Sequence, residues 1–449
     1  MSVSCSYWKG EILLALVVLL AAPASAGDLR VVLEAEGGVR NDGNYDRIET
    51  VGDPALEEEA DENLARAGFN LRLSYEMPRW TLALGYFPSY EWMLDDTNVN
   101  GTTHRLDLGL DGNLTRRLKM SVRERLLSSP GLDLYQPFLA AEPMALTRRG
   151  DQLNHALDLG LEQELTRRSV LLLGAGHTLH SFDGEDLSDT QTLLARMGLG
   201  FRPAEDRRFD LLATAGRYDF GERRVPIGLG SVDLAGHKSN IATLGAGWQQ
   251  PFFRDGRFRI EAGMFALDST RTAVIPDPAD GEPTVIEEDF EETGWRGALE
   301  ISRQLEVFGW SLGYRHDVSA GVGLGRATEV DNAFAGISAN VGRQLFLGLD
   351  ANLSRHHELV DGPAADLILE NKLVESAVGT ARFSWGFSSI ARLNGGYSWI
   401  WQESRVQPFE DLSYSRYFVG LALQVFRTGE EPRDPVPQEE MEDDEPDAR

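Results

Sequence analysis

The sequence predicts an all-β protein, a closed antiparallel up-and-down transmembrane β-barrel of about 18 strands (16–18). Two observations support this fold. Apolar residues recur at every second position along most of the chain, as in strands whose two faces meet different surroundings. The connections between these alternating segments are by turns short and long along the chain. After residue 26, no apolar run approaches the roughly 18 residues that a membrane helix needs.

The first 26 residues are predicted to be a signal peptide rather than part of the fold. Lys9 supplies a positive charge, Ile12–Leu20 form an apolar core, and Ala24-Ser25-Ala26 has the small side chains of a cleavage site. The apolar core is far shorter than the roughly 20 residues of a membrane-spanning helix. Cys5 is the only cysteine. Its removal with this segment would leave a chain without disulfides or thiolate ligands.

The formal net charge is −28. This surplus of acid argues against a nucleic-acid partner, which requires a basic face. The acidic residues concentrate in segments 49–62, 277–292 and 427–449, whereas the alternating segments are nearly balanced. Residues 427–449 combine proline and acid with little apolar mass, which predicts a disordered tail.

Alternation predicts strands throughout residues 27–426. It is clearest at 69–77, at 345–353 and at 417–425, where every second residue is apolar or aromatic. The alternating segments begin near residues 29, 64, 80, 103, 118, 151, 168, 190, 207, 236, 256, 291, 307, 330, 344, 371, 387 and 412. Closure into a barrel is required because an open sheet edge in lipid would leave backbone groups unpaired.

Short connections are predicted at Pro78-Arg79, Thr115–Arg117, Thr166-Arg167, Pro203–Asp206, Pro251–Asp255, Leu305-Glu306, Gly342-Arg343 and Gly386. Longer ones, including 221–235 and 268–290, alternate with them. Segregation of the two kinds to opposite ends is typical of outer-membrane barrels, which have short periplasmic turns and long extracellular loops. The predicted location is therefore the cell outer membrane. Its lipid and lipopolysaccharide are the expected surroundings, and the acidic tail would lie in the periplasm.

The tryptophans are predicted to form aromatic girdles at the two membrane interfaces. Four lie near the short connections and four near the long ones, and both sets avoid the strand middles. The girdle residues are Trp80, Trp92, Trp248, Trp295, Trp310, Trp385, Trp399 and Trp401.

The units HRLDLGLDGNLTRRLKMSV (104–122) and NHALDLGLEQELTRRSVLLLGAG (154–176) resemble hairpins of Gram-negative outer-membrane β-barrels. They are most similar to poorly characterised porin families found near exopolysaccharide systems. This resemblance of pattern covers nearly all of residues 29–426 and implies polysaccharide export components as further partners. The segment YFVGLALQVF (417–426) resembles the C-terminal signal that the outer-membrane assembly machinery recognises. Phe426, however, falls out of phase with the apolar face.

If the apolar phase faces lipid, the opposite phase faces the lumen. A barrel of 16–18 strands leaves an aqueous interior, in which charged side chains set selectivity. The alternative is that the charges only pair with one another and stiffen the wall. The pore-lining candidates are Arg72, Glu76, Arg105, Asp107, Asp111, Lys119, Arg123, Arg125, Asp158, Arg257, Arg259, Glu261, Arg296, Glu300, Arg315 and Asp350.

The connection at 128–150 is unusually apolar for an exposed loop, with Leu132, Leu134, Tyr135 and Phe138 close together. Such a cluster would be costly to leave in water. Two interpretations stay open: the loop folds inward and constricts the pore, or it packs across the rim of the barrel.

No catalytic residues, cofactor or metal are expected. His177 and His180 are three apart in a strand and therefore point to opposite faces, so they cannot share a metal ion. No spaced catalytic signature is present, and an enzyme is not expected. The predicted function is an outer-membrane porin or exporter with a mixed-charge lumen, passing small hydrophilic solutes or exopolysaccharide. The alternative is a non-transporting surface scaffold or adhesin that acts through its long acidic loops.

Overall fold

The structure is a computed structural model. It describes residues 28–42, 62–94, 100–129, 152–182, 188–204, 206–227, 230–234, 236–253, 255–275, 284–320, 327–358, 373–404 and 412–428. The predicted signal peptide, the apolar part of the connection at 128–150 and the tail beyond residue 428 lie outside these residues. Among the described residues, no helix is long and apolar enough to cross a membrane.

All regular elements of the described residues are strands. They are β1 (Asp28–Asp42), β2 (Glu62–Met77), β3 (Trp80–Met93), β4 (Gly101–Asn113), β5 (Leu118–Ser129), β6 (Gln152–Glu164), β7 (Ser169–Phe182), β8 (Thr190–Ala204), β9 (Arg207–Phe220), β10 (Arg223–Ile227), β11 (Gly230–Leu234), β12 (His237–Phe252), β13 (Gly256–Ile275), β14 (Thr284–Gln304), β15 (Phe308–Ser319), β16 (Thr328–Val341), β17 (Leu345–Glu358), β18 (Leu373–Trp385), β19 (Ala391–Ser404) and β20 (Leu412–Arg427).

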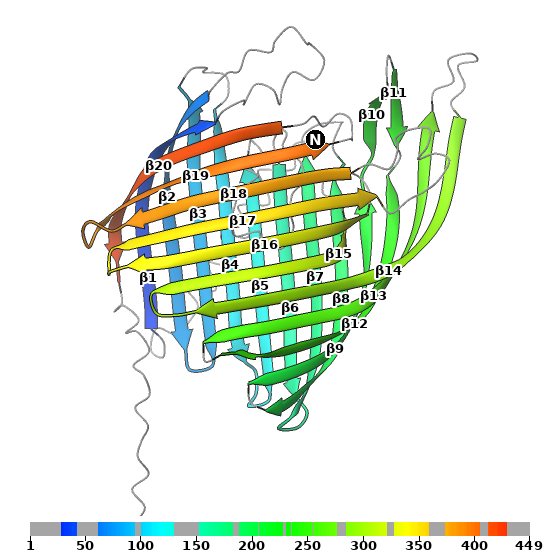
Figure 1. Ribbon diagram of the computed structural model, residues 1–449, viewed down its shortest axis with the longest axis horizontal. Helices are drawn as coiled ribbons and strands as arrows, with labels where there is room; N and C mark the ends of the chain where they lie inside the picture. The colour runs from blue at the N-terminus through cyan, green and yellow to red at the C-terminus, as the bar shows by residue number, and fades with distance from the viewer. Residues whose placement is uncertain are drawn as a thin grey trace, which may run out of the picture.

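Eighteen of these strands form one closed antiparallel barrel (Figure 1). Each pairs with its neighbour in the chain, except that β9 pairs directly with β12. The short strands β10 and β11 form a hairpin between them, and β11 also pairs briefly with β13, at Asp233–Val274 and Leu234–Ala273. The barrel closes where β1 pairs with β20, from Val32–Arg427 to Asp42–Arg416. The predicted fold class is thereby confirmed.

Most predicted strand starts agree with the structure. Sixteen of the 18 lie within two residues of the observed start, and the exceptions are β14 and β19. The long connection predicted at 268–290 is wrong over most of its length, because β13 continues to Ile275 and β14 begins at Thr284. Three consecutive acidic residues, Glu287, Glu288 and Asp289, interrupt the alternation of the sequence there. The connection predicted at 221–235 contains the hairpin β10–β11.

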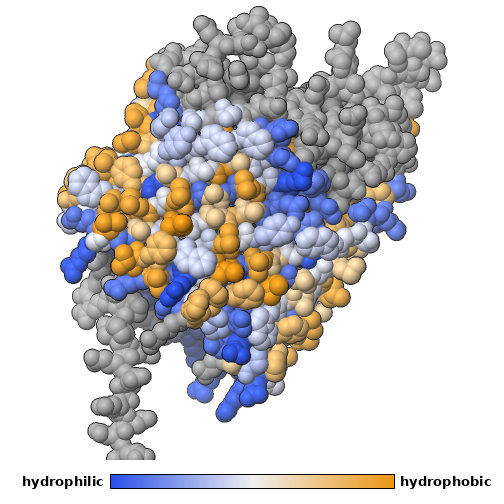
Figure 2. Space-filling view, in the orientation of Figure 1, coloured by the Kyte–Doolittle hydropathy of each residue, from blue (hydrophilic) through white to orange (hydrophobic). Residues whose placement is uncertain are grey.

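The two faces of the wall differ in chemistry. One phase of the alternation presents large apolar side chains outward, and Leu244 and Met264 are 67% and 65% exposed. Figure 2 shows apolar side chains gathered in a band across the visible face of the barrel, with hydrophilic ones toward the lower edge of the view. A continuous apolar surface of this kind would be unfavourable in water and fits a hydrocarbon layer.

The turns between β4 and β5 and between β6 and β7 have the same local cause. In the first, the Oγ1 atom of Thr115 accepts hydrogen bonds from the backbone N–H groups of Arg117 (3.2 Å) and Leu118 (3.1 Å). In the second, Thr166 does the same for Arg168 (3.1 Å) and Ser169 (3.0 Å). A threonine side chain thus fixes each Leu-Thr-Arg-Arg turn.

Phe426 returns to the apolar phase through a bulge. Gln424 pairs with Glu34, but Phe426 pairs with Leu33, so Val425 is an extra residue in β20. Such a bulge shifts the alternation by one position. Phe426 therefore lies opposite Leu33 on the outer face, where it is 51% exposed.

Candidate functional site

The inner wall of the barrel is the candidate site. Alternation and strand register place all sixteen predicted charged residues on the face opposite the exposed apolar side chains. Ten of them line two cavities. These ten are Arg72, Asp107, Asp111, Arg123, Arg125, Asp158, Arg259, Glu261, Arg296 and Arg315.

The first cavity has a volume of about 580 Å³ and lies inside β1–β5 and β20, toward their short-turn ends. We call it the turn-end cavity. Five arginines and two acidic residues of the inner face line it, namely Arg30, Arg72, Arg123, Arg125, Arg427, Asp107 and Asp111. Phe87 projects from the inner face of β3, and the guanidinium carbons of Arg72 and Arg105 lie 5.6 and 5.2 Å from its ring centroid. Cation–π contact therefore holds two positive charges side by side.

Several charges of this region are paired. Arg105 donates to Asp107 and Arg123 to Asp111, each at 2.6 Å, and Arg30 lies 3.7 Å from Glu76. Arg125 has no ion pair within the described part of the chain. The turn-end cavity thus keeps a surplus of positive charge.

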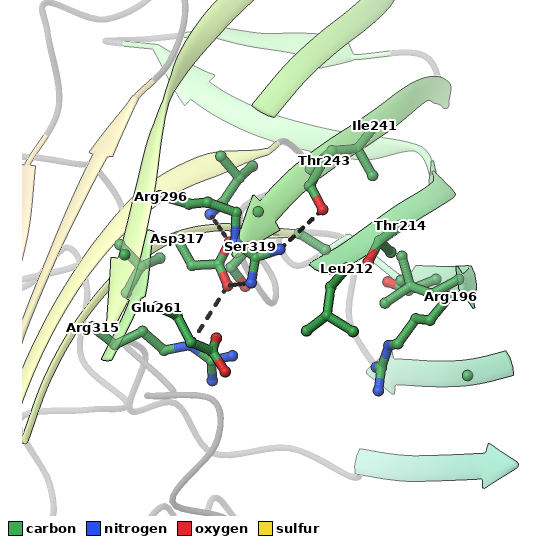
Figure 3. A pocket seen from close by; sticks show the side chains of 18 of the residues that line it. Arg196, Leu212, Thr214, Ile241, Thr243, Glu261, Arg296, Arg315, Asp317 and Ser319 are labelled. Atoms are coloured by element: carbon green, nitrogen blue, oxygen red, sulfur yellow. Dashed lines mark hydrogen bonds and ion pairs between the residues drawn. The ribbon is translucent and has the colours of Figure 1, made fainter. Parts of the chain in front are cut away.

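The second cavity, of about 560 Å³, lies inside β6–β9 and β12–β16. We call it the central cavity. Arg296 donates from Nη2 to Oδ2 of Asp317 (3.1 Å) and from Nη1 to Oγ1 of Thr243 (3.0 Å). Arg315 lies 3.5 Å from the same carboxylate. Figure 3 shows this group facing Arg196 across the cavity.

The charges of the central cavity are incompletely neutralised. Four arginines line it, against the carboxylates of Asp158, Glu261 and Asp317. Arg259 pairs with Glu261. Arg196 lies 3.7 Å from Asp158, and both side chains are about half exposed. Exposed pairs of this kind contribute little attraction, so Arg196 remains available to a ligand.

A buried apolar cluster adjoins the central cavity, which Tyr218, Ile241, Val318 and Ala320 of this cluster also line. Tyr218, Phe220, Ile241, Phe265 and Leu267 project from the inner phase of β9, β12 and β13, and each is at most 5% exposed. Val318, Ala320 and Ala327 pack against them. We call these eight residues the apolar cluster. A polar lumen does not require such a cluster.

The remaining predicted residues lie on the inner face outside the two cavities. Asp350 forms an ion pair with Arg382 of β18, with Nη2 of Arg382 3.2 Å from Oδ2 of Asp350. Lys119, Arg257 and Glu300 also lie there by register. Whether the predicted residues line a conducting pore remains a proposal.

Sequence reasoning missed four inner-face residues that carry contacts: Phe87, Arg196, Asp317 and Arg382. The three charged ones occupy the polar phase of their strands, and the same alternation rule would have found them. It also missed polar groups on the outer face, where Nε2 of His155 lies 3.1 Å from Oε1 of Glu124. The rule that charged residues face the lumen does not predict this pair, because both residues belong to the outer phase.

The prediction that His177 and His180 point to opposite faces is confirmed. Nε2 of His177 lies 2.9 Å from the amide nitrogen of Gln191 on the outer face. Nδ1 of His180 lies 2.8 Å from Oδ1 of Asn154 on the inner face. Within the described residues, no group of three His, Asp or Glu side chains is placed to hold a metal ion.

The eight tryptophans predicted to form the girdles all lie in the outer phase. Trp80, Trp248, Trp310 and Trp385 lie toward the short-turn ends of their strands, and Trp92, Trp399 and Trp401 toward the opposite ends. Trp295 lies farther from the end of its strand, where β14 and β15 separate. Their role as interfacial girdles remains a prediction.

A closed antiparallel barrel with an apolar outer face and a charged inner wall is a transmembrane β-barrel of the outer-membrane class. No family model and no curated protein matches this sequence. Among solved structures, the barrel is similar to Pseudomonas aeruginosa OccK2 (OpdF) in complex with glucuronate, with 11% identity, a TM-score of 0.40, and coverage of 89% of this chain and 99% of that one.

It is also similar to Pseudomonas aeruginosa OpdO, with 11% identity, a TM-score of 0.43, and coverage of 89% and 98% of the two chains. A third similar structure is the ferric-catecholate import receptor Fiu of E. coli, with 7% identity, a TM-score of 0.45, and coverage of 90% and 82%. At these identities, residue roles do not transfer to this chain.

Proposed function

We propose that this barrel is an outer-membrane channel that passes small hydrophilic solutes through a water-filled, mixed-charge lumen. The observation that carries the proposal is the contrast between the two faces of the wall. Leu244 and its outer-phase neighbours suit hydrocarbon, whereas the inner phase holds paired and unpaired charges around two cavities. In a lumen of this width, charged side chains act on passing ions through their field.

The distribution of charge favours anionic solutes. The chain as a whole carries a net charge of −28. Both cavities nevertheless have more arginines than acidic residues, and Arg125 has no ion pair among the described residues. The positive field inside the wall would attract small anions and repel small cations.

The sidedness and the solute are parts of the same proposal. The short turns would face the periplasm, as in other barrels of this class. An exopolysaccharide is the larger solute that the sequence resemblance implies, and the arginine surplus would favour an anionic one. Blockage of single-channel current by a purified acidic polysaccharide, but not by a neutral one of the same length, would favour this larger solute.

Planar-bilayer recording of the purified protein tests the channel function. We expect stable single-channel currents and, across a KCl gradient, a reversal potential whose sign indicates preferred passage of chloride. KCl suits this measurement because the two ions have similar mobilities in water. A barrel that inserts but carries no current would contradict the proposal and would favour a surface scaffold.

A further inference from the structure

The pairing of β14 with β15 is incomplete, and we call the boundary between these two strands the seam. Strands β14 and β15 pair only from Gln304–Gly309 to Gly297–His316. This is the shortest pairing between neighbouring strands of the described barrel. Beyond it, β14 continues to Thr284 paired with β13 alone, and β15 continues to Ser319 paired with β16 alone. Figure 1 shows β13 and β14 extending together away from β15.

Beyond the last pair, the wall overlaps itself. A Cβ atom added to Gly294, on the inner face of β14, would lie 2.5 Å from Phe265 and 3.1 Å from Oε1 of Glu329. Glu329 belongs to the outer phase of β16, opposite Val318. The inner face of the β13–β14 hairpin therefore covers the outer face of the β15–β16 hairpin. The apolar cluster joins residues of β13 with Val318 at this overlap.

Side chains, rather than strand pairing, close the overlap. The ring of Trp295 stacks on His316, with centroids 4.0 Å apart and planes 13° from parallel. On the inner side, Arg296 binds Asp317 at 3.1 Å. Oδ1 of Asp317 also accepts the backbone N–H of Val318 at 3.0 Å. That hydrogen bond satisfies one donor of β15 beyond its paired region.

The overlap connects the central cavity with the lipid-facing surface. Arg296, Asp317 and Val318 take part in the closure and also line the cavity, whereas Trp295 on the outer face is 55% exposed. The cavity volume of about 560 Å³ lies within the usual range of small-molecule sites. Its lining combines four arginines with four members of the apolar cluster, Tyr218, Ile241, Val318 and Ala320, which matches a molecule with an anionic head and an apolar chain.

We propose that the β14–β15 seam is a lateral opening through which a single-chain amphipathic carboxylate passes between the membrane and the central cavity. Arg196 and Arg259 receive the carboxylate, and the apolar chain lies along Ile241 and Tyr218, which both line the cavity. Passage requires Trp295 to move off His316 and Arg296 to part from Asp317. No backbone pairing of the barrel needs to break. This inference goes beyond conduction of hydrophilic solutes and does not depend on it.

Binding is tested with a dansyl-labelled undecanoate and the full-length protein in detergent. We expect saturable binding that the R196Q/R259Q double variant weakens about tenfold. The R382Q variant is the matched control, because Arg382 is also an inner-face arginine but lies outside the cavity. Undecanol, which lacks the carboxylate, should compete poorly. Absence of saturable binding to the unaltered protein, or equal weakening by R382Q, would overturn the assigned site.

Passage through the seam is tested with W295C/H316C in a C5S background, bridged by a bifunctional methanethiosulfonate. The probe is preloaded into the bilayer of proteoliposomes, and its arrival in the cavity is followed by energy transfer from tryptophan. We expect the bridge to slow arrival at least tenfold and reduction to restore it. The control is the pair L349C/A381C, which would bridge β17 and β18 within their paired region. Equal arrival rates with and without the 295–316 bridge would contradict lateral passage, whatever the ionic conductance.

Discussion

Asp317 of β15 accepts a hydrogen bond from Arg296 of β14 at 3.1 Å, one residue beyond the last backbone pair of the two strands. The same carboxylate binds the N–H of Val318. Asp317 thus ties two strands together where the sheet no longer does so. Its loss would leave Nη2 of Arg296 and the backbone N–H of Val318 without the acceptor they share.

Asp317→Ala is therefore expected to destabilise the barrel by about 1.5–3 kcal/mol, the range for hydrogen bonds that involve a charged group. Asp350→Ala is the matched control. Asp350 also pairs with an arginine, Arg382, but across strands that remain fully paired. We expect a smaller loss for the control. Guanidinium-induced unfolding in lipid vesicles measures both, and equal losses would mean that Asp317 has no special role at the seam.

Leu84→Arg should impair assembly far more than Ala83→Arg. The two residues are adjacent on β3, but Leu84 lies opposite Leu108 in the outer phase, and Ala83 lines the turn-end cavity. An arginine facing hydrocarbon costs about 2–4 kcal/mol near the middle of the bilayer. The heat-dependent mobility of the folded barrel in gel electrophoresis measures assembly. If both variants assembled equally well, the assignment of Leu84 to the outer face and Ala83 to the inner face would be wrong. Leu108 is a less suitable site, because Glu124 lies opposite and could neutralise the new charge.

Arg125→Glu is expected to reduce the preference for chloride several-fold, because it reverses a charge that has no ion pair among the described residues of the turn-end cavity. The measurement is the reversal potential across a KCl gradient. Arg79→Glu, in the exposed turn between β2 and β3, makes the same charge change outside the cavity. A similar shift in this control would mean that the net charge of the protein, and not the cavity, sets selectivity.

The outer-face pair Glu124–His155 is expected to show strong coupling. Glu124 lies opposite Leu108 and Leu157, so His155→Leu would leave a carboxyl group without its partner in apolar surroundings. We expect that single change to cost about 1–3 kcal/mol. The double change to leucine should cost much less, since it removes both polar groups. A double-mutant cycle by chemical unfolding measures the coupling, and additive losses would contradict it.

Gly342→Ala should destabilise the turn between β16 and β17 by about 1 kcal/mol. Gly342 has φ +67°, and a Cβ atom there would meet no neighbour, so only the backbone conformation opposes alanine. Gly379→Ala is the control, because Gly379 also has open space but an ordinary strand conformation. Thermal unfolding should show a loss for the first variant and none for the second.

Alternation predicted the strand number and most strand starts, because each strand separates two different solvents. This contrast determines the order of apolar and polar residues within each strand, independently of its neighbours. Alternation failed at Glu287–Asp289, where three consecutive acidic residues interrupt it. It also could not predict the seam, since the partner of β14 beyond Gly297 depends on how two distant hairpins tilt. The bulge at Val425 depends in the same way on the register between β20 and β1.

For the candidate site, the polar phase correctly placed residues such as Arg296 and Arg315 on the inner wall. The phase rule does not predict which charges meet, because the contact of Arg296 with Asp317 crosses the seam. It also failed for Tyr218 and Phe265, whose apolar side chains lie on the inner face. Both residues belong to the apolar cluster, which lies at the overlap of β13–β14 with β15–β16.

Closure by β1 and β20 makes the two strands that are farthest apart in synthesis neighbours in the wall. A chain cut short before Leu412 would leave β1 and β19 each with a free edge. In hydrocarbon, no solvent is available to satisfy the exposed backbone groups. Unpaired backbone groups alone therefore disfavour membrane insertion of a chain that lacks β20. No protein needs to recognise the missing strand.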